Sequence, residues 1–197
     1  MVKKENNMTI IGITGRKQNG KDTIADNLLQ YGFIKRSFAD SLKEGSMKIF
    51  GFTKEQGYGD LKEVIDEEWG VTPRQVLQFV GTDLFRGHMG ELIEGLGPGF
   101  WVKVIVTFYK RMLKEDPNAK LVVPDLRFPD EVDAIHDLGG IVIKVKRPGY
   151  DTSDDCHESE LMIDKIQNCE YFVDNDGSFE DLWKKVDKIM ETEGYIN

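Results

Sequence analysis

The chain has 197 residues, of which 40% are hydrophobic and 31% charged, and its formal net charge is −9. Such a length and composition are typical of one globular domain with its own core. The acidic balance argues against an extended nucleic-acid surface, because such surfaces neutralise phosphates with Lys and Arg. A small phosphorylated substrate is still compatible with the charge, since it senses only the local field of its pocket.

The sequence has neither the cysteines of a secreted scaffold nor a membrane segment. Cys156 and Cys169 are too few for a disulfide framework and lack the spacing of a metal site. No apolar run approaches the ~20 residues that cross a bilayer, and the polar start Met1–Asn7 is unlike a signal peptide. We therefore expect a cytoplasmic protein without a membrane partner, in which residues 1–7 form a loose arm.

The first quarter of the chain predicts strands that alternate with helices. The apolar run Met8–Thr14 predicts a buried strand, and helical spacing of apolar residues over Gly20–Tyr31 predicts a helix that ends at Gly32. A second strand is expected over Phe33–Phe38, followed by a short helix over Asp40–Phe50.

The middle of the chain is less regular. Charges and glycines over Gly51–Gly70 predict a surface excursion. One apolar helical face over Pro73–Met89 predicts a helix whose first turn contains the proline. After the glycine-rich loop Gly95–Gly99, helical periodicity returns over Trp101–Leu113.

The last third again alternates, which decides the fold class. Strands are expected over Leu121–Val123, Ile141–Val145 and Tyr171–Val173, and helices over Asp130–Leu138, Glu158–Ile166 and Phe179–Met190, with a polar loop over Arg147–His157. Apolar strands that alternate with helices imply a parallel sheet covered on both faces. The predicted fold class is therefore α/β.

The strongest motif lies between the first strand and the first helix. The segment Gly15–Thr23 (GRKQNGKDT) has two glycines five residues apart and then Lys21, the spacing of a phosphate-binding P-loop. Its candidate ligand residues are Gly15, Lys17, Asn19, Gly20, Lys21, Asp22 and Thr23. Asp22 stands where Ser or Thr usually helps to hold Mg²⁺, and a carboxylate is also a suitable hard ligand, directly or through water. The motif therefore predicts a nucleoside triphosphate with Mg²⁺ bound through Asp22 and Thr23.

A P-loop alone does not choose among kinases, GTPases and ATP-driven motors. The Asn-Lys-x-Asp element that reads guanine is not in the sequence, and 197 residues leave little room for the further subdomains of a motor. A small-molecule kinase fits the size best. The competing interpretation of the motif is a glycine-rich turn that carries a lysine without a phosphate.

Six ordered segments of the chain resemble the phage-type deoxynucleoside monophosphate kinases, a branch of the P-loop kinases. They are Gly15–Thr23, Phe38–Lys43 (FADSLK), Arg74–Asp83 (RQVLQFVGTD) with Trp101–Lys103 (WVK), Val123–Arg127 (VPDLR) with Glu131, Arg147–Gly149 leading to His157, and Asn175–Ser178 (NDGS). The resemblance covers most of the chain from Ile10 to Asp187. The family's loop also reads Gly-Lys-Asp-Thr, so Asp22 becomes a point of agreement.

The resemblance implies a three-layer P-loop kinase fold with a parallel sheet of about five strands, in one domain over residues 1–197. ATP would lie along Gly15–Thr23 with its base near Asn175 and Gly177. The acceptor would contact Phe38, Ala39, Lys43, Arg74, Gln78, Gly81, Thr82, Arg86, Trp101, Arg127 and Glu131. The segment 147–160 would be a lid that carries Arg147, His157 and Glu160.

The implied reaction is transfer of the γ-phosphoryl group of ATP to a deoxynucleoside monophosphate. Lys21, Asp125 and Arg127 are the expected catalytic residues, with Arg127 neutralising the transferring oxygens. Glu131 is expected to orient Arg127, and Trp101 offers a face on which the acceptor base stacks. Because the acceptor is already an anion, no strong general base is required.

Each assignment has a structural alternative. Arg74 is also compatible with a solvated surface, Trp101 with core packing, His157 with a structural role, and Asn175–Gly177 with a plain turn. At the level of function, the rivals are a kinase similar to those of dephospho-coenzyme A or phosphomevalonate, and a nucleotide-binding protein without catalysis. The helix over residues 100–113 is compatible with a core position or a homodimer contact.

Overall fold

The computed structural model describes residues 9–96, 99–150 and 158–196, the side chains of 158–161 excepted. The predicted arm over residues 1–7 and His157 lie outside the described residues, as does part of the 95–99 loop. The chain forms two compact units. The sheet unit contains residues 1–36 and 106–197, and the helical unit contains residues 37–105. The expectation of a single domain stays a prediction, because compactness alone does not decide whether two units fold independently.

The sheet unit contains the predicted parallel sheet. Its strands are β1 (Thr9–Thr14), β2 (Phe33–Lys35), β3 (Lys120–Leu126), β4 (Ile141–Lys146) and β5 (Tyr171–Asp174), in the order β2-β3-β1-β4-β5. Every pair is parallel, with Ile11 of β1 opposite Val122 of β3 and Ile141 of β4. Because β1 is central, the loop that follows it lies at the carboxyl edge of the sheet between two neighbouring strands.

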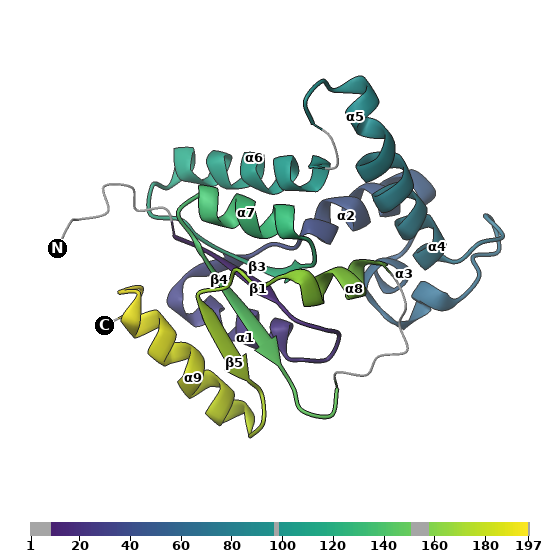
Figure 1. Cartoon of the computed structure of the whole chain (residues 1–197). Helices are drawn as coiled ribbons and strands as arrows, with labels where there is room; N and C mark the ends of the chain where they lie inside the picture. Colours follow the sequence, from purple (N-terminus) through teal and green to yellow (C-terminus); the bar gives the residue numbers. More distant parts are fainter. Residues whose placement is uncertain (1–8, 97–98, 151–157, 197) are drawn as a thin grey trace. The chain divides into compact units, whose positions relative to one another are not determined.

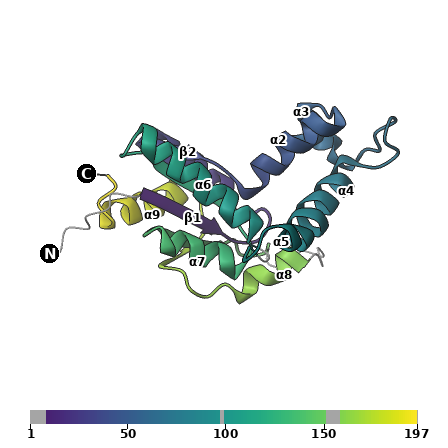
Figure 2. The same cartoon turned by 90° about the horizontal axis from the view of Figure 1, so that it is seen from above.

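Helices cover both faces of this sheet. α1 (Lys21–Leu28) and α9 (Phe179–Thr192) pack together on one face, where their apolar residues form the core with β1, β4 and β5. α7 (Pro129–Asp137) packs against β1 and β4 from the other face, and Figure 2 shows it running along β1. The predicted α/β class and the five-stranded sheet are confirmed (Figure 1).

A buried lysine fixes the end of α8 (Glu158–Lys165) to the sheet. Lys144 of β4 is 6% exposed, and its ammonium donates hydrogen bonds to the carbonyl oxygens of Ile163 and Ile166 at 3.1 and 2.6 Å. Burial lowers the pKa of Lys144. A cation at a helix C-terminus satisfies the last carbonyl groups and opposes the helix dipole.

The helical unit contains α2 (Phe38–Phe50), α3 (Lys54–Tyr58), η2 (Asp60–Glu63), α4 (Pro73–Gln78), η3 (Phe79–His88), α5 (Met89–Leu92) and the start of α6 (Phe100–Glu115). Two short helices thus occur inside the predicted excursion over 51–70. Among the described residues, no helix is both long and apolar enough to span a bilayer.

Two predicted elements were wrong in extent or type. The strand expected over Phe33–Phe38 ends at Lys35, because Ser37 begins α2 with a capping box in which its N–H donates to Asp40 at 2.7 Å. The single helix expected over Pro73–Met89 changes after Gln78 into the π-helix η3. Val76, Val80 and Leu84 are four residues apart, a spacing that predicts an α-helix, so periodicity did not reveal the π-helical segment.

Candidate functional site

The Gly15–Thr23 loop begins at the buried end of β1. The hydroxyl of Thr14 donates to the carbonyl oxygen of Leu126 at 2.9 Å, which ties β1 to β3 where the loop starts. Gly15 follows with a φ of 147°, and a Cβ there would lie 2.3 Å from the Val145 carbonyl oxygen. Only glycine fits this close approach to β4, so the first glycine of the motif sets the path of the loop.

Two asparagines hold the loop against the sheet. Asn19 is 1% exposed and donates from Nδ2 to the Val145 carbonyl oxygen at 3.2 Å. Asn175, just after β5, donates from Nδ2 to the Asn19 carbonyl oxygen at 3.0 Å. Gly20 has a φ of 101° and ends the loop at the N-terminus of α1. The loop is therefore fixed from both β4 and the segment after β5, which pre-forms it for a ligand.

The Lys21 ammonium lies over this loop. Its Nζ donates to the carbonyl oxygens of Gly15 and Arg16 at 2.6 and 2.9 Å. Arg16 in turn pairs with Asp164 of α8 at 2.5 Å. Two cations and the positive end of α1 therefore gather around the loop, which is the charge pattern that binds phosphate.

A pocket of about 550 Å³ opens beside the loop within the sheet unit. It is lined by Gln18, Gly20, Lys21, Asp22, Thr23, Arg147, Asn175, Gly177, Ser178, Phe179 and Glu180. Six of the predicted ATP residues and the predicted lid residue Arg147 thus share one pocket, while Gly15, Lys17 and Asn19 are outside its lining. The lining also contains Gln18, Ser178, Phe179 and Glu180, which were not among the individually predicted ligand residues. Gln18 lies within the predicted Gly15–Thr23 loop and Ser178 within the Asn175–Ser178 segment, whereas Phe179 and Glu180 lie outside both.

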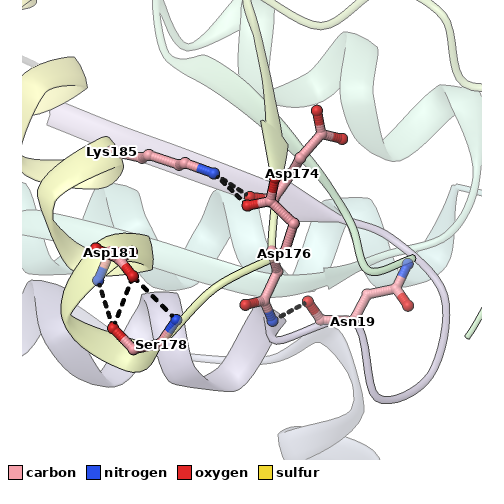
Figure 3. A network of polar contacts seen from close by, with 7 residues as sticks. Asn19, Asp174, Asp176, Ser178, Asp181 and Lys185 are labelled. Atoms are coloured by element: carbon pink, nitrogen blue, oxygen red, sulfur yellow. Dashed lines mark hydrogen bonds and ion pairs between the residues drawn. The ribbon is translucent and has the colours of Figure 1, made fainter. Parts of the chain in front are cut away.

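The wall after β5 is held rigid by polar contacts (Figure 3). Lys185 of α9 donates to the Asp174 carbonyl oxygen at 2.7 Å and to the Asp176 carboxylate at 2.6 Å. Ser178 and Asp181 form a capping box at the start of α9. Hydrogen bonds from Lys185 and from Ser178 lower the pKa values of Asp176 and Asp181, respectively. The Asn175–Gly177 segment is thus a defined wall of the pocket.

The predicted lid is described only in part. Arg147 follows β4, and its guanidinium lies 4.3 Å from the centre of the Tyr150 ring. Glu160 is in α8, and His157 is outside the described residues. A lid over 147–160 stays a prediction.

The end of β3 carries the predicted catalytic pair of the sheet unit. Asp125 and Arg127 are half-buried where the strand ends. Glu131 is 4% exposed, and its carboxylate accepts the backbone N–H groups of Arg127 and Phe128 at 2.7 and 3.2 Å. The Glu131 carboxylate therefore holds the main chain of Arg127 in place. This structural role is additional to the predicted one, in which Glu131 orients the Arg127 side chain.

The helical unit holds the other predicted acceptor residues. Phe38 is buried, Ala39, Lys43 and Arg86 are half-buried, and Arg74, Gln78 and Thr82 are exposed. Lys43 lies 4.6 Å from the centre of the Tyr58 ring, and Arg74 pairs with Glu63.

Trp101 is 9% exposed and packs against Phe85 and Phe100. Its indole N–H donates to the carbonyl oxygen of Gly81 at 2.9 Å, inside η3. A Cβ on Gly81 would lie 2.6 Å from Leu42, so η3 approaches α2 closely at this glycine. These contacts give Trp101 a packing role, and base stacking on it stays a prediction.

The loop supplies suitable ligands for Mg²⁺. Asp22 and Thr23 place a carboxylate and a hydroxyl in the pocket lining beside Lys21. Within the part of the chain that the structure describes, no group of three or more His, Cys, Asp or Glu forms a metal cluster. Mg²⁺ commonly takes one or two protein oxygens and completes its shell with phosphates and water. The donor set therefore fits a metal that arrives with a nucleotide.

Comparisons with known proteins agree with this geometry. The family model of deoxynucleotide monophosphate kinase matches residues 34–186. A protein of Acanthamoeba polyphaga mimivirus, provisionally described as a deoxynucleotide monophosphate kinase, is 36% identical over 96% of this chain and 100% of its own length. The deoxynucleotide monophosphate kinase of Enterobacteria phage T4 is 30% identical over 78% of this chain and 57% of its own.

Among solved structures, the shikimate kinase of Aquifex aeolicus superposes with a TM-score of 0.51 at 10% identity, covering 94% of this chain and 98% of that one. This likeness concerns the fold alone. The family match spans most of the chain and the mimivirus relative spans nearly all of it. The chain belongs to the deoxynucleotide monophosphate kinase family.

Proposed function

We propose that this chain transfers the γ-phosphoryl group of ATP to a deoxynucleoside monophosphate, giving ADP and the deoxynucleoside diphosphate. The observation that carries the proposal is the pocket over the phosphate loop, which gathers Lys21, Asp22 and Thr23 in a chain of this family. The family match also favours this acceptor over dephospho-coenzyme A or phosphomevalonate, the alternatives that the loop alone left open.

The residues that line the pocket support one orientation for ATP. The triphosphate would follow the loop toward Lys21, because backbone N–H groups and the α1 dipole favour anions there. The base would lie toward Asn175 and Gly177, where Phe179 exposes 62% of its surface at the pocket wall. An exposed ring at this place provides a face for stacking any nucleotide base.

The reaction needs positioning and charge rather than a covalent intermediate. An oxygen of the acceptor phosphate attacks the γ-phosphorus, and the bond to the bridging oxygen breaks as ADP leaves. Lys21 would exchange its contacts with the Gly15 and Arg16 carbonyls for phosphate oxygens. Arg127 and Asp125 are our candidates for contacting the transferring group and the acceptor. Bound Mg²⁺, held by Asp22 and Thr23, would neutralise phosphate charge.

The acceptor would be held by cations of the helical unit. Arg74 is a predicted phosphate contact, as is Arg127 of the sheet unit, because guanidinium groups bind phosphate through two N–H groups at once. Lys43 and Arg86 are further predicted acceptor residues. Trp101 supports this region through its bond to Gly81. The free-nucleotide substrates and the viral relatives support action in a host cytoplasm without a nucleic-acid partner.

A coupled ADP-release assay tests the proposal. Purified protein is given Mg²⁺, ATP and, one at a time, deoxynucleoside monophosphates, nucleoside monophosphates, dephospho-coenzyme A and phosphomevalonate. We expect ADP release that depends on at least one deoxynucleoside monophosphate. Release only with dephospho-coenzyme A or phosphomevalonate, or with none of the acceptors, would contradict the proposal.

A further inference from the structure

A lysine outside the phosphate-loop motif is bonded to the carboxylate inside it. Lys35 is the last residue of β2, and its Nζ lies 2.7 Å from Asp22 and 2.9 Å from Asp26. Asp22 and Asp26 are four residues apart, so they occupy the same face of α1 on consecutive turns. One ammonium group therefore bridges two carboxylates, of which only Asp22 belongs to the motif.

The three groups differ in where they face. Asp22 lines the pocket over the loop, whereas Asp26 lines a second pocket that is formed with residues of α9. The Lys35 side chain is 27% exposed, against 76% for Asp22 and 61% for Asp26. The lysine is thus the covered member of the cluster, and Asp22 is the carboxylate with most freedom to turn toward a ligand.

We propose that Lys35 and Asp26 are positioning residues that control how readily Asp22 engages the metal of the bound nucleotide. This inference rests on the proposed function, because it assigns the metal to the donor nucleotide. Lys35 competes with the metal for the Asp22 carboxylate. Asp26 keeps the half-covered ammonium paired when Asp22 turns away, and so lowers the cost of that exchange.

Removing the charge of Asp26 and removing that of Lys35 should change metal binding by Asp22 in opposite directions. With Asp26→Asn, Asp22 becomes the only charged partner of Lys35, so the metal must separate a stronger pair. With Lys35→Met, Asp22 has no competing cation, and two carboxylates four residues apart repel one another. Asp22 should then bind the metal more readily than it does in the unchanged protein.

The test measures how much Mg²⁺ strengthens nucleotide binding, without turnover. Isothermal titration with a non-hydrolysable ATP analogue gives one dissociation constant in Mg²⁺ and one in EDTA, and their ratio is the metal coupling. Partly exposed ion pairs are worth roughly 0.2–1 kcal/mol, which converts to an expected change of about 1.4- to fivefold. Asp26→Asn should lower the coupling, and Lys35→Met should raise it.

Two further variants make the result specific. Asp133→Asn removes the same charge from an exposed position on α7 and should leave the coupling unchanged. Asp22→Asn should lower the coupling and abolish the effect of Asp26→Asn in the double variant. If each of Lys35→Met and Asp26→Asn changes the dissociation constant in Mg²⁺ and the one in EDTA by the same factor, the metal coupling is unchanged. The role of the two residues is then structural, and the inference is wrong. If the analogue fails to bind the unchanged protein, the proposed function itself is wrong.

Discussion

Replacing Gly20 by alanine should destabilise the protein more than the same change at Gly32. Both glycines have positive φ, 101° and 80°, so each alanine incurs backbone strain of about 1–2 kcal/mol. Their surroundings differ: a Cβ at Gly20 would lie 2.6 Å from Nδ2 of Asn175, whereas nothing lies within 4 Å of one at Gly32. Asn175 must therefore move only in the Gly20→Ala variant.

That movement breaks a bond that holds the phosphate loop. The Asn175 amide donates to the Asn19 carbonyl oxygen at 3.0 Å, and such a bond contributes about 0.5–1.5 kcal/mol. Gly20→Ala should therefore lose about 1 kcal/mol more than Gly32→Ala. For a chain of this size the difference corresponds to a melting temperature lower by about 2–4 °C.

Differential scanning calorimetry of the two variants measures this difference. The cause is tested in an Asn175→Ala background, where the amide is missing and the extra loss at Gly20 should vanish. Equal destabilisation at the two glycines, or an extra loss that persists without the amide, would refute the proposed bracing of the loop by Asn175.

Further predictions concern the donor site and a covered thiol. Lys21→Ala should lower kcat by about 10²–10³ with the fold intact by circular dichroism, since it removes a charge aimed at the transferring phosphates; near-normal turnover would contradict its role. Phe179→Ala should raise the KM for ATP several-fold without changing that for the acceptor, whereas Phe172→Ala, 60% exposed on β5 and outside the pocket lining, should change neither. Burial raises the pKa of Cys169 from 9.0 to about 11, so in a Cys156→Ser variant its alkylation should quicken about tenfold per pH unit up to about pH 11. The neutral thiol is favoured on folding, so its contribution to stability is present below about pH 9 and lost as the pH rises through 11; a plateau in alkylation near pH 9 would show a solvated thiol.

The sequence predicted the sheet well because its strands are short apolar runs between polar turns. Every predicted strand is present, and the phosphate loop lies between a strand and a helix as its motif requires. The error at Phe38 concerns a boundary, because the strand was expected to run to Phe38, whereas the capping box of Ser37 and Asp40 begins α2 at that residue, two residues before the predicted helix start. Local hydrogen bonding decided that boundary, and hydrophobicity did not distinguish the two outcomes.

The site was predictable where one short segment supplies it. Lys21, Asp22 and Thr23 follow one another in the loop, so spacing alone identified them. Phe179 entered the pocket only because β5 lies at one end of the sheet and turns into α9 beside the loop, a proximity that spacing does not encode. Lys35 was missed for the same reason, since its bonds to α1 depend on where β2 ends.

Trp101 illustrates a limit of residue type as a guide. The family resemblance implied a face for the acceptor base at Trp101, and core packing was the alternative. The ring packs against Phe85 and Phe100 and donates its N–H to the Gly81 carbonyl oxygen, while base stacking stays a prediction. A tryptophan serves either purpose, and only its neighbours distinguish them. The π-helix η3, which contains the Gly81 acceptor of this bond, was likewise not predicted from the apolar spacing of the sequence.

In the proposed reaction, a deoxynucleoside monophosphate receives the γ-phosphoryl group of ATP. The most direct measurement separates the nucleotides by chromatography after incubation with Mg²⁺, γ-labelled ATP and the acceptor that gives the fastest ADP release. We expect one labelled deoxynucleoside diphosphate for each ADP formed. ADP accompanied by labelled inorganic phosphate, with no labelled diphosphate, would show that water is the acceptor and would contradict the proposed function.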